Sequence, residues 1–176
     1  MIERTLVLIK PDAVKRKLIG KIISRFEQVD LTIEEMKLIN KPAFNTVAKH
    51  YPEKKEWLQL IGQKTIESYQ KYNFDLKKDL GTEDTLQIGK QVRKWLIEYI
   101  TEGPIIAIII TGNHAIEMVR KMIGHTAPIF ADLGTIRGDF SIDSAEFADK
   151  EGRAIYNLVH ASGNSEEAIE EITLWF

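Results

Sequence analysis

One histidine in this sequence stands where a side chain could take part in group transfer. His160 ends an apolar stretch and is followed at once by the polar turn Ser162-Gly163-Asn164. Neutral imidazole is a nucleophile at pH 7, so a ring held rigidly at this place could accept a transferred group. The plain alternative is a structural histidine that only makes hydrogen bonds, and His160 alone does not separate the two.

Three cations stand where they could meet phosphate oxygens. Arg137 lies in a loop between two glycines, where its guanidinium can bind a phosphate, although it could equally pair with Asp139. Arg120 falls in a predicted last helical turn, a place that basic residues also occupy because of the helix dipole. Lys10 ends the first predicted strand, where an ordinary solvated lysine is the alternative. No glycine-rich phosphate loop occurs, so side chains and a metal ion would have to neutralise bound phosphate.

The composition excludes several kinds of site and partner. The 176 residues include 24 Lys and Arg, 26 Asp and Glu, and no cysteine. Disulfides, zinc–thiolate sites and thiol nucleophiles are therefore excluded, and no basic excess favours a dedicated nucleic-acid partner. No apolar run approaches the ~20 residues that cross a bilayer, and the N-terminus lacks the features of a secretory signal. We expect a cytoplasmic protein without a membrane partner.

The elements that must position these residues are strands and helices in alternation. Apolar or alternating patterns predict strands at 5–9, 31–39, 105–110 and 155–160, the second with an irregularity at Glu34-Glu35. Apolar residues at helical spacing predict intervening helices, including one over 14–29 and a last one that starts at Asn164 with a capping-box pattern. This order predicts an α/β (α+β) protein with a ferredoxin-like split βαβ fold, a four-stranded, mainly antiparallel sheet covered by helices.

Two segments interrupt the alternation of strands and helices. Residues 53–90 are polar and mixed in charge, yet they contain helical pieces and too many aromatic residues for a flexible linker. Residues 143–152 form a second, smaller polar stretch. We predict a single domain over 1–176, in which 53–90 is an inserted helical segment beside the mouth of a cleft.

Several short motifs together resemble the nucleoside diphosphate kinase family. They occur in family order at 4–12 (RTLVLIKPD), 18–20, 25–27, 50–51, 103–104, 134–140 (GTIRGDF), 160–162 and 175–176. Each motif is moderately specific, but their common order and spacing make chance agreement very improbable. The resemblance extends from residue 3 to residue 176, apart from 53–90 and 143–152.

The resemblance implies an enzyme that moves the γ-phosphoryl group of a nucleoside triphosphate, usually ATP, to a nucleoside diphosphate through a phosphohistidine. His160 matches the nucleophile, Glu171 the glutamate that orients it, and Ser162 the serine that supports the glutamate. Mg²⁺ is expected to accompany the nucleotide, and a homo-oligomer, hexamer or tetramer, is expected. The positions that match nucleotide contacts are Lys10, Tyr51, Val92, Arg120, Thr126, Arg137 and Asn157.

The sequence departs from the family at the base-binding positions. Val92 stands where a base-stacking phenylalanine is expected, and Ala154 stands where a valine is expected. Trp95, or Tyr69 and Tyr72 of the inserted segment, are candidates to compensate.

A different class of function is a non-catalytic nucleotide- or nucleic-acid-binding module on the same scaffold. Such a module would need aromatic and basic residues on an exposed sheet face, where the predicted strands offer Tyr156 and little else.

Overall fold

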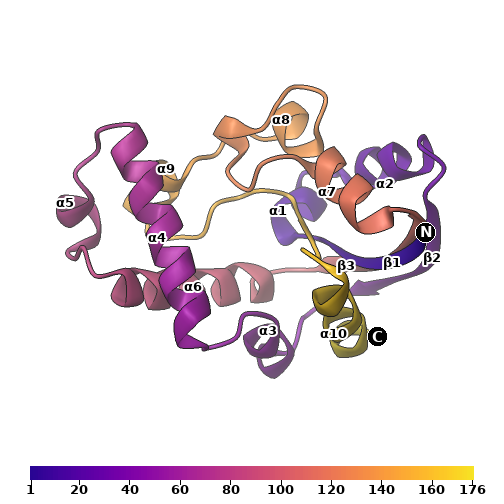
Figure 1. Ribbon diagram of the computed structural model, residues 1–176, viewed down its shortest axis with the longest axis horizontal. Coiled ribbons are helices and arrows are strands. Elements are labelled where there is room, and N and C mark those ends of the chain that lie inside the picture. Colours follow the sequence, from indigo (N-terminus) through magenta and orange to yellow (C-terminus); the bar gives the residue numbers. More distant parts are fainter.

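A four-stranded antiparallel sheet forms the centre of the computed structural model, which describes all residues 1–176 (Figure 1). The strand order is β2-β3-β1-β4. The strands are β1 (Ile2–Ile9), β2 (Thr32–Ile39), β3 (Ile105–Asn113) and β4 (Val159–Ala161). Every neighbouring pair is antiparallel. The predicted α+β class and ferredoxin-like architecture are confirmed.

The two central strands are buried on both faces of the sheet. Leu6 and Leu8 of β1 pack into the cluster on one face, whereas Val7 and Ile9 pack into the larger cluster on the other. Successive side chains of a strand point to opposite faces, so a strand covered on both sides needs a continuous apolar run. That requirement explains the apolar runs from which β1 and β3 were predicted.

Helices cover both faces of the sheet (Figure 1). One face is covered by α1 (Pro11–Lys15), α2 (Ile19–Glu27), α7 (Ala115–Ile123) and α8 (Ile136–Phe140). The other is covered by α3 (Phe44–His50), the C-terminal half of α6 (Thr85–Thr101) and α10 (Ser165–Trp175).

The segment predicted as an insertion is helical and extends away from the sheet (Figure 1). It contains α4 (Lys55–Lys71), which packs along α6, and α5 (Leu76–Leu80). The second polar stretch forms α9 (Ala145–Lys150), which packs against α4 and α5, so the two predicted insertions contact each other. A 3-10 turn, η1 (Pro128–Phe130), lies in the loop that follows α7.

Two predicted elements differ from the structure, and one detail is confirmed. The single helix predicted over 14–29 is wrong, because Lys17 adopts a left-handed conformation (φ 58°) and separates α1 from α2. The strand predicted over 155–160 is also wrong at its start, because Leu158 is left-handed (φ 69°) and pairing begins only at Val159. The irregularity predicted in β2 is confirmed as a register shift between Ile33 and Glu35.

Candidate active site

His160 is held between the sheet and the last helix by a carboxylate and a hydroxyl. Its Nε2 lies 2.9 Å from each carboxylate oxygen of Glu171. Ser162 Oγ donates a hydrogen bond to Glu171 Oε2 at 2.6 Å and accepts one from the Leu6 backbone N–H at 3.3 Å. The side chain of His160 is 21% exposed, so the ring borders solvent. With Nε2 facing the carboxylate, Nδ1 is the ring nitrogen left with a free lone pair.

The turn between β4 and α10 brings Glu171 back to His160. Asn164 caps α10 by accepting a hydrogen bond from the Glu167 N–H at 2.8 Å, and the Glu167 carboxylate accepts one from the Gly163 N–H at 2.7 Å. These contacts satisfy N–H groups that a helix start would otherwise leave unpaired. Glu171 then lies about two helical turns beyond the cap, on the side of α10 that faces β4.

Glu171 is negatively charged over the whole physiological pH range. Burial alone would raise its pKa, but the charge of His160 and their hydrogen bond outweigh burial and lower the pKa of Glu171 to about 2. A carboxylate fixed at Nε2 stabilises a positive imidazole ring. The pair is therefore suited to a reaction in which the ring gains charge.

Lys10 and Asn157 form a buried polar contact at the end of β1. Lys10 is only 4% exposed, and its Nζ donates to Asn157 Oδ1 at 2.8 Å. Asn157 Nδ2 donates in turn to the Thr126 carbonyl at 2.8 Å, which joins the loop after α7 to the residues before β4. Burial, and secondarily the nearby charge of Arg137, lower the pKa of Lys10 to about 7.

Arg137 is buried, and it donates mainly to backbone carbonyls. Its Nε, Nη1 and Nη2 donate to the carbonyls of Asn157, Gly124 and Val159 at 3.1, 2.9 and 2.7 Å. Three of its five N–H groups are used in this way, and two remain for a ligand. Burial lowers its pKa to about 10, so the guanidinium stays charged at neutral pH. Lys10 and Arg137 thus lie close enough for the charge of Arg137 to lower the pKa of Lys10, and the charge of Asp12 offsets this only in part.

Asp12 and Tyr99 support this arrangement, although the sequence did not identify them as site residues. Asp12 Oδ1 accepts a hydrogen bond from the Tyr99 hydroxyl at 2.5 Å, and Asp12 Oδ2 accepts one from the Leu158 N–H at 3.2 Å. The Lys10 Nζ lies 5.1 Å from the centroid of the Tyr99 ring. The carboxylate therefore stabilises the left-handed turn at Leu158 that sends the chain into β4. Asp12 could have been recognised from the sequence because it belongs to the motif at 4–12, whereas no sequence pattern points to Tyr99.

His50 is a second buried histidine that the sequence did not identify as functional. Its ring centroid lies 4.4 Å from that of His160, with the ring planes at 81°. His50 Nδ1 accepts a hydrogen bond from the Trp175 indole N–H at 3.2 Å and lies 3.5 Å from Glu171 Oε1. Burial lowers the pKa of His50 to about 3, so this ring is neutral. Its only signal in the sequence was its position directly before Tyr51.

Two histidines and a carboxylate come close enough together here to be considered as a metal site. Potential ligand atoms of His50, His160 and Glu171 all lie within 4.8 Å of one another. The Nδ1 lone pair of His50 already accepts the Trp175 N–H, and Glu171 already accepts from Ser162. This donor set is therefore committed to hydrogen bonds, and we assign no metal to it.

The remaining predicted residues differ in exposure. Arg120 and Thr126 are exposed, and the charge of Arg120 contributes to the lowered pKa of Arg137. Tyr51 is buried beside His50, with a ring-centroid distance of 4.7 Å, and its hydroxyl has no partner.

The two positions expected from the resemblance to contact the base lie together in one small cluster. Val92 packs against the cluster of Trp95, Tyr99 and Ala154, and Ala154 is 4% exposed. Tyr69 and Tyr72, the other candidates for stacking, face Phe74 and Phe130 respectively. Of the candidates to compensate, Trp95 is the one that lies beside Val92 and Ala154.

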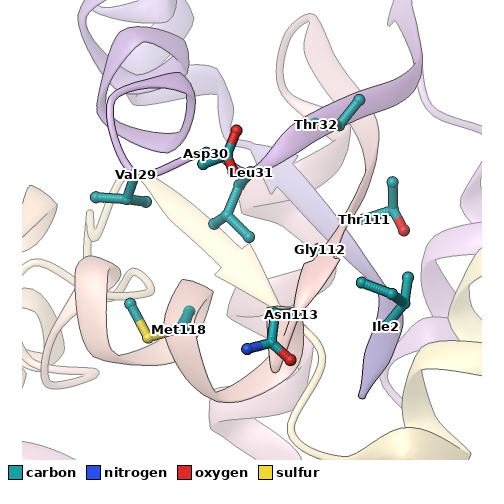
Figure 2. A pocket seen from close by; sticks show the side chains of 9 residues that line it. All are labelled: Ile2, Val29, Asp30, Leu31, Thr32, Thr111, Gly112, Asn113 and Met118. Carbon is teal, nitrogen blue, oxygen red and sulfur yellow. The ribbon is translucent and has the colours of Figure 1, made fainter.

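A separate pocket of about 510 Å³ lies far from His160 (Figure 2). Figure 2 shows Val29, Leu31 and Met118 on one side of the pocket and Ile2 on the other. Ile2 begins β1, whereas His160 pairs with Leu8 near the end of that strand. Six residues of strand separate these points by roughly 20 Å. This pocket is therefore not part of the candidate active site.

Comparison with known proteins shows that the chain is similar to enzymes that act on nucleotides. The family model described as "Nucleoside diphosphate kinase" matches residues 3–65 and 85–176, so 66–84 is the unmatched part of the segment predicted as an insertion. A nucleoside diphosphate kinase of Pyrobaculum aerophilum is 45% identical over 99% of this chain and 95% of its own length. One from Pyrococcus furiosus is 41% identical over 99% of this chain and 83% of its own length.

Solved structures agree in fold over the whole chain. The crystal structure of the Pyrobaculum aerophilum NDP kinase superposes with a TM-score of 0.93 at 44% identity, covering 100% of this chain and 96% of that one. A transition-state mimic of the Borrelia burgdorferi nucleoside-diphosphate kinase, with bound vanadate and ADP, superposes with a TM-score of 0.77 at 34% identity. That likeness covers 99% of this chain and 87% of the other.

Proposed function

This chain belongs to the nucleoside diphosphate kinase family, and from that premise we propose that His160 carries the phosphoryl group during transfer between nucleotides. The donor is a nucleoside triphosphate, usually ATP, and the acceptor is a nucleoside diphosphate. The observation that carries the proposal is the hydrogen-bonded set of His160, Glu171 and Ser162. Lys10, directly after β1, and Arg137, in α8, supply positive charge beside it.

The reaction proceeds in two balanced half-reactions. The Nδ1 lone pair of His160 forms a bond to the γ-phosphorus while the bond from that phosphorus to the bridging oxygen breaks, which releases the diphosphate. The ring becomes positively charged, and the Nε2–H donates to the Glu171 carboxylate, which stabilises that charge. A terminal oxygen of the acceptor diphosphate then attacks the same phosphorus, and Nδ1 leaves with its lone pair.

Charge stabilisation is the main contribution of the remaining residues. Negative charge spreads over the equatorial phosphoryl oxygens in the transition state, so fixed cations lower its energy. Lys10, Arg120 and Arg137 supply these cations. Thr126, Asn157 and Tyr51 offer neutral hydrogen bonds to the phosphates and the ribose.

Mg²⁺ enters with the nucleotide in this proposal. Both oxygens of Asp12 accept hydrogen bonds from protein groups, and so does the Glu171 carboxylate. Those hydrogen bonds already engage these carboxylates, so the oxygens of the nucleotide phosphates would hold the ion. The bound ion adds positive charge to the phosphates.

Base recognition is proposed to depend on apolar contact at the cluster around Val92. Val92 is half-buried and packs on the buried Trp95 and Ala154, so it is the member of these three that can offer apolar surface to a flat base. Contact of this kind discriminates weakly between bases, so broad nucleotide specificity is expected.

A non-catalytic role is not favoured. Binding of RNA to the sheet would need an exposed face, but β1 and β3 are covered on both sides. Tyr156, the aromatic residue that the predicted last strand offered, lies before β4 and not in the sheet.

We further propose that the protein forms a homo-oligomer, a hexamer or tetramer, and works in the cytoplasm. No helix is long and apolar enough to span a bilayer. Sedimentation equilibrium should give a mass six or four times the 20.2 kDa of one chain. A mass of one chain at micromolar concentration would contradict the assembly.

Phosphorylation of the isolated protein tests the central proposal. Incubation with γ-labelled ATP and Mg²⁺ should give a label that is lost in acid and kept in base, as expected of phosphohistidine. His160→Ala should abolish the label. His114→Asn is the matched control, because His114 is exposed and lies at the other end of the sheet, beside the residue that pairs with Ile2. A fully labelled His160→Ala protein would refute the assignment.

A further inference from the structure

The carboxylate of Glu171 lies between two histidines, and the proposed reaction uses only one of them. Glu171 Oε1 is 2.9 Å from His160 Nε2 and 3.5 Å from His50 Nδ1. A protonated Nδ1 on His50 could turn toward this oxygen and compete with His160 for it. Which nitrogen of His50 carries the proton therefore matters to the reacting histidine.

The indole of Trp175 selects the tautomer of His50. The Trp175 side chain has a single polar group, an N–H that can only donate, and it points at His50 Nδ1 at a distance of 3.2 Å. An acceptor must carry a lone pair, so Nδ1 is unprotonated and the proton of the neutral ring is on Nε2. The side chain of His50 is 1% exposed, which leaves water little access to alter this choice.

This arrangement leaves one polar group of His50 without a protein partner. The Nε2 atom of His50 is buried and makes no hydrogen bond. The opposite tautomer would let Nδ1–H donate to Glu171 but would set it against the Trp175 N–H. That donation would span 3.5 Å and be weak, whereas the Trp175 N–H would lose its acceptor and face a second donor, so the tautomer with the proton on Nε2 is the more stable one.

From this geometry we propose that Trp175 is a positioning residue for phosphoryl transfer, because its indole N–H keeps His50 from donating to Glu171 and so reserves the carboxylate for His160. The inference rests on the proposed role of His160. Burial and the neighbouring His160 keep the pKa of His50 near 3, so protonation of the ring does not bypass the tautomer choice at working pH.

The consequence for the reaction follows from the charge that develops on His160. When the ring gains a phosphoryl group, its Nε2–H donates to Glu171, and a second donor on the same oxygen would weaken that bond. The loss would appear in the phosphorylation step, because nucleotide contacts come from other residues. A hydrogen bond of ordinary strength corresponds to a reduction of about five- to tenfold in the rate.

The tautomer can be read directly in the unmodified protein. Long-range ¹H–¹⁵N spectra of the ¹⁵N-histidine-labelled chain distinguish protonated from unprotonated ring nitrogens, and the spectrum of His50→Leu assigns the His50 signals. We expect an unprotonated Nδ1 and a protonated Nε2 on His50. A protonated Nδ1 would overturn the proposal, whether or not the protein proves to be a kinase.

Trp175→Phe tests the effect on catalysis, since it keeps an aromatic ring and removes the N–H. We expect the single-turnover phosphorylation rate to fall about five- to tenfold with an unchanged KM, and the His50 proton to move to Nδ1. In the His50→Leu background, Trp175→Phe should cause no further loss of rate.

If Trp175→Phe slowed the reaction only by loss of packing, the result would not depend on His50. An equal loss of rate from Trp175→Phe with and without His50 would overturn the inference. An unmodified chain that takes no label from ATP would instead refute the proposed function, and the tautomer spectra would still be interpretable.

Discussion

Lys10 is the residue whose surroundings are most unusual for its type. Its ammonium group is buried, beside Arg137, and its one hydrogen bond is to a neutral amide oxygen. Both burial and the neighbouring cation disfavour the charged form, which is why its pKa falls to about 7. The negative charge of an incoming phosphate would offset both effects and favour the charged form of Lys10.

Nucleotide binding should therefore be coupled to proton uptake by Lys10. The free protein loses the Lys10 proton as pH rises through about 7, whereas a bound phosphate raises the pKa back toward that of free lysine. Between the Lys10 pKa of the free protein and that of the nucleotide-bound protein, affinity for ADP should fall by up to about tenfold per pH unit as the pH rises. Calorimetry of ADP binding at pH 8.5 in buffers of different ionisation enthalpy measures the proton directly.

The control for this coupling is Lys10→Met, whose unbranched side chain is one atom shorter and cannot titrate. It should bind ADP more weakly and take up no proton. Equal heats in every buffer for the unmodified protein would show that Lys10 is charged before the nucleotide arrives.

At the scale of elements, two glycines decide how closely α4 lies against α6. A Cβ on Gly62 would lie 1.9 Å from the Thr85 carbonyl oxygen, and one on Gly89 would lie 2.0 Å from the Leu58 carbonyl oxygen. The backbones of the two helices are thus in contact at two points. α6 also carries Tyr99, so its place relative to α4 affects the support of Asp12.

Replacing either glycine by alanine should lower the stability of the protein. Alanine favours a helix by about 1 kcal/mol over glycine, but the clash with a backbone oxygen forces the helices apart at a cost of about 1–3 kcal/mol. Urea unfolding of Gly62→Ala and Gly89→Ala should therefore give midpoints below that of the unmodified protein.

Gly20 is the matched control for these two substitutions. It lies in α2, and a Cβ there would have nothing within 4 Å. Gly20→Ala should raise the free energy of unfolding by about 0.5–1 kcal/mol. If the free energy of unfolding rose as much in Gly62→Ala as in Gly20→Ala, the helices would not touch at this point.

For the molecule as a whole, the end of α4 reaches the loop that carries Thr126. The Tyr72 ring stacks on Phe130 with 5.4 Å between centroids and 4° between planes, and Lys71 Nζ lies 3.7 Å from the Phe130 centroid. His125 meets the same ring edge-on at 5.3 Å. A segment more than 50 residues earlier in the chain thus braces the loop that carries Thr126.

Loss of this stacking should weaken nucleotide binding more than it slows transfer. Tyr72→Ala removes an aromatic pair worth about 0.5–1.5 kcal/mol and frees the loop with Thr126, so the KM for the nucleotide should rise roughly two- to tenfold with little change in kcat. Steady-state kinetics with ATP and a nucleoside diphosphate measures both constants. Tyr72→Phe keeps the ring and should match the unmodified protein; a KM raised equally by both variants would contradict the bracing role.

Local pattern was enough for much of the fold and for the centre of the candidate site. Strands β1 and β3 could be predicted because burial on both faces demands unbroken apolar runs, and the cap of α10 could be predicted because its hydrogen bonds join neighbours in sequence. His160, Glu171 and Ser162 lie within twelve residues, so the motif and its spacing could identify them together, although their roles remain proposals.

Contacts between distant residues depended on how the chain folds back on itself. His50 and Trp175 are 125 positions apart, and Asp12 and Tyr99 are 87 apart. No periodicity links such pairs, because their contact arises from the order of strands in the sheet and from the helices that cover it. A contact between distant residues also explains why β4 is shorter than predicted. The Leu158 N–H donates to the Asp12 carboxylate, which the alternating pattern of 155–160 cannot reveal.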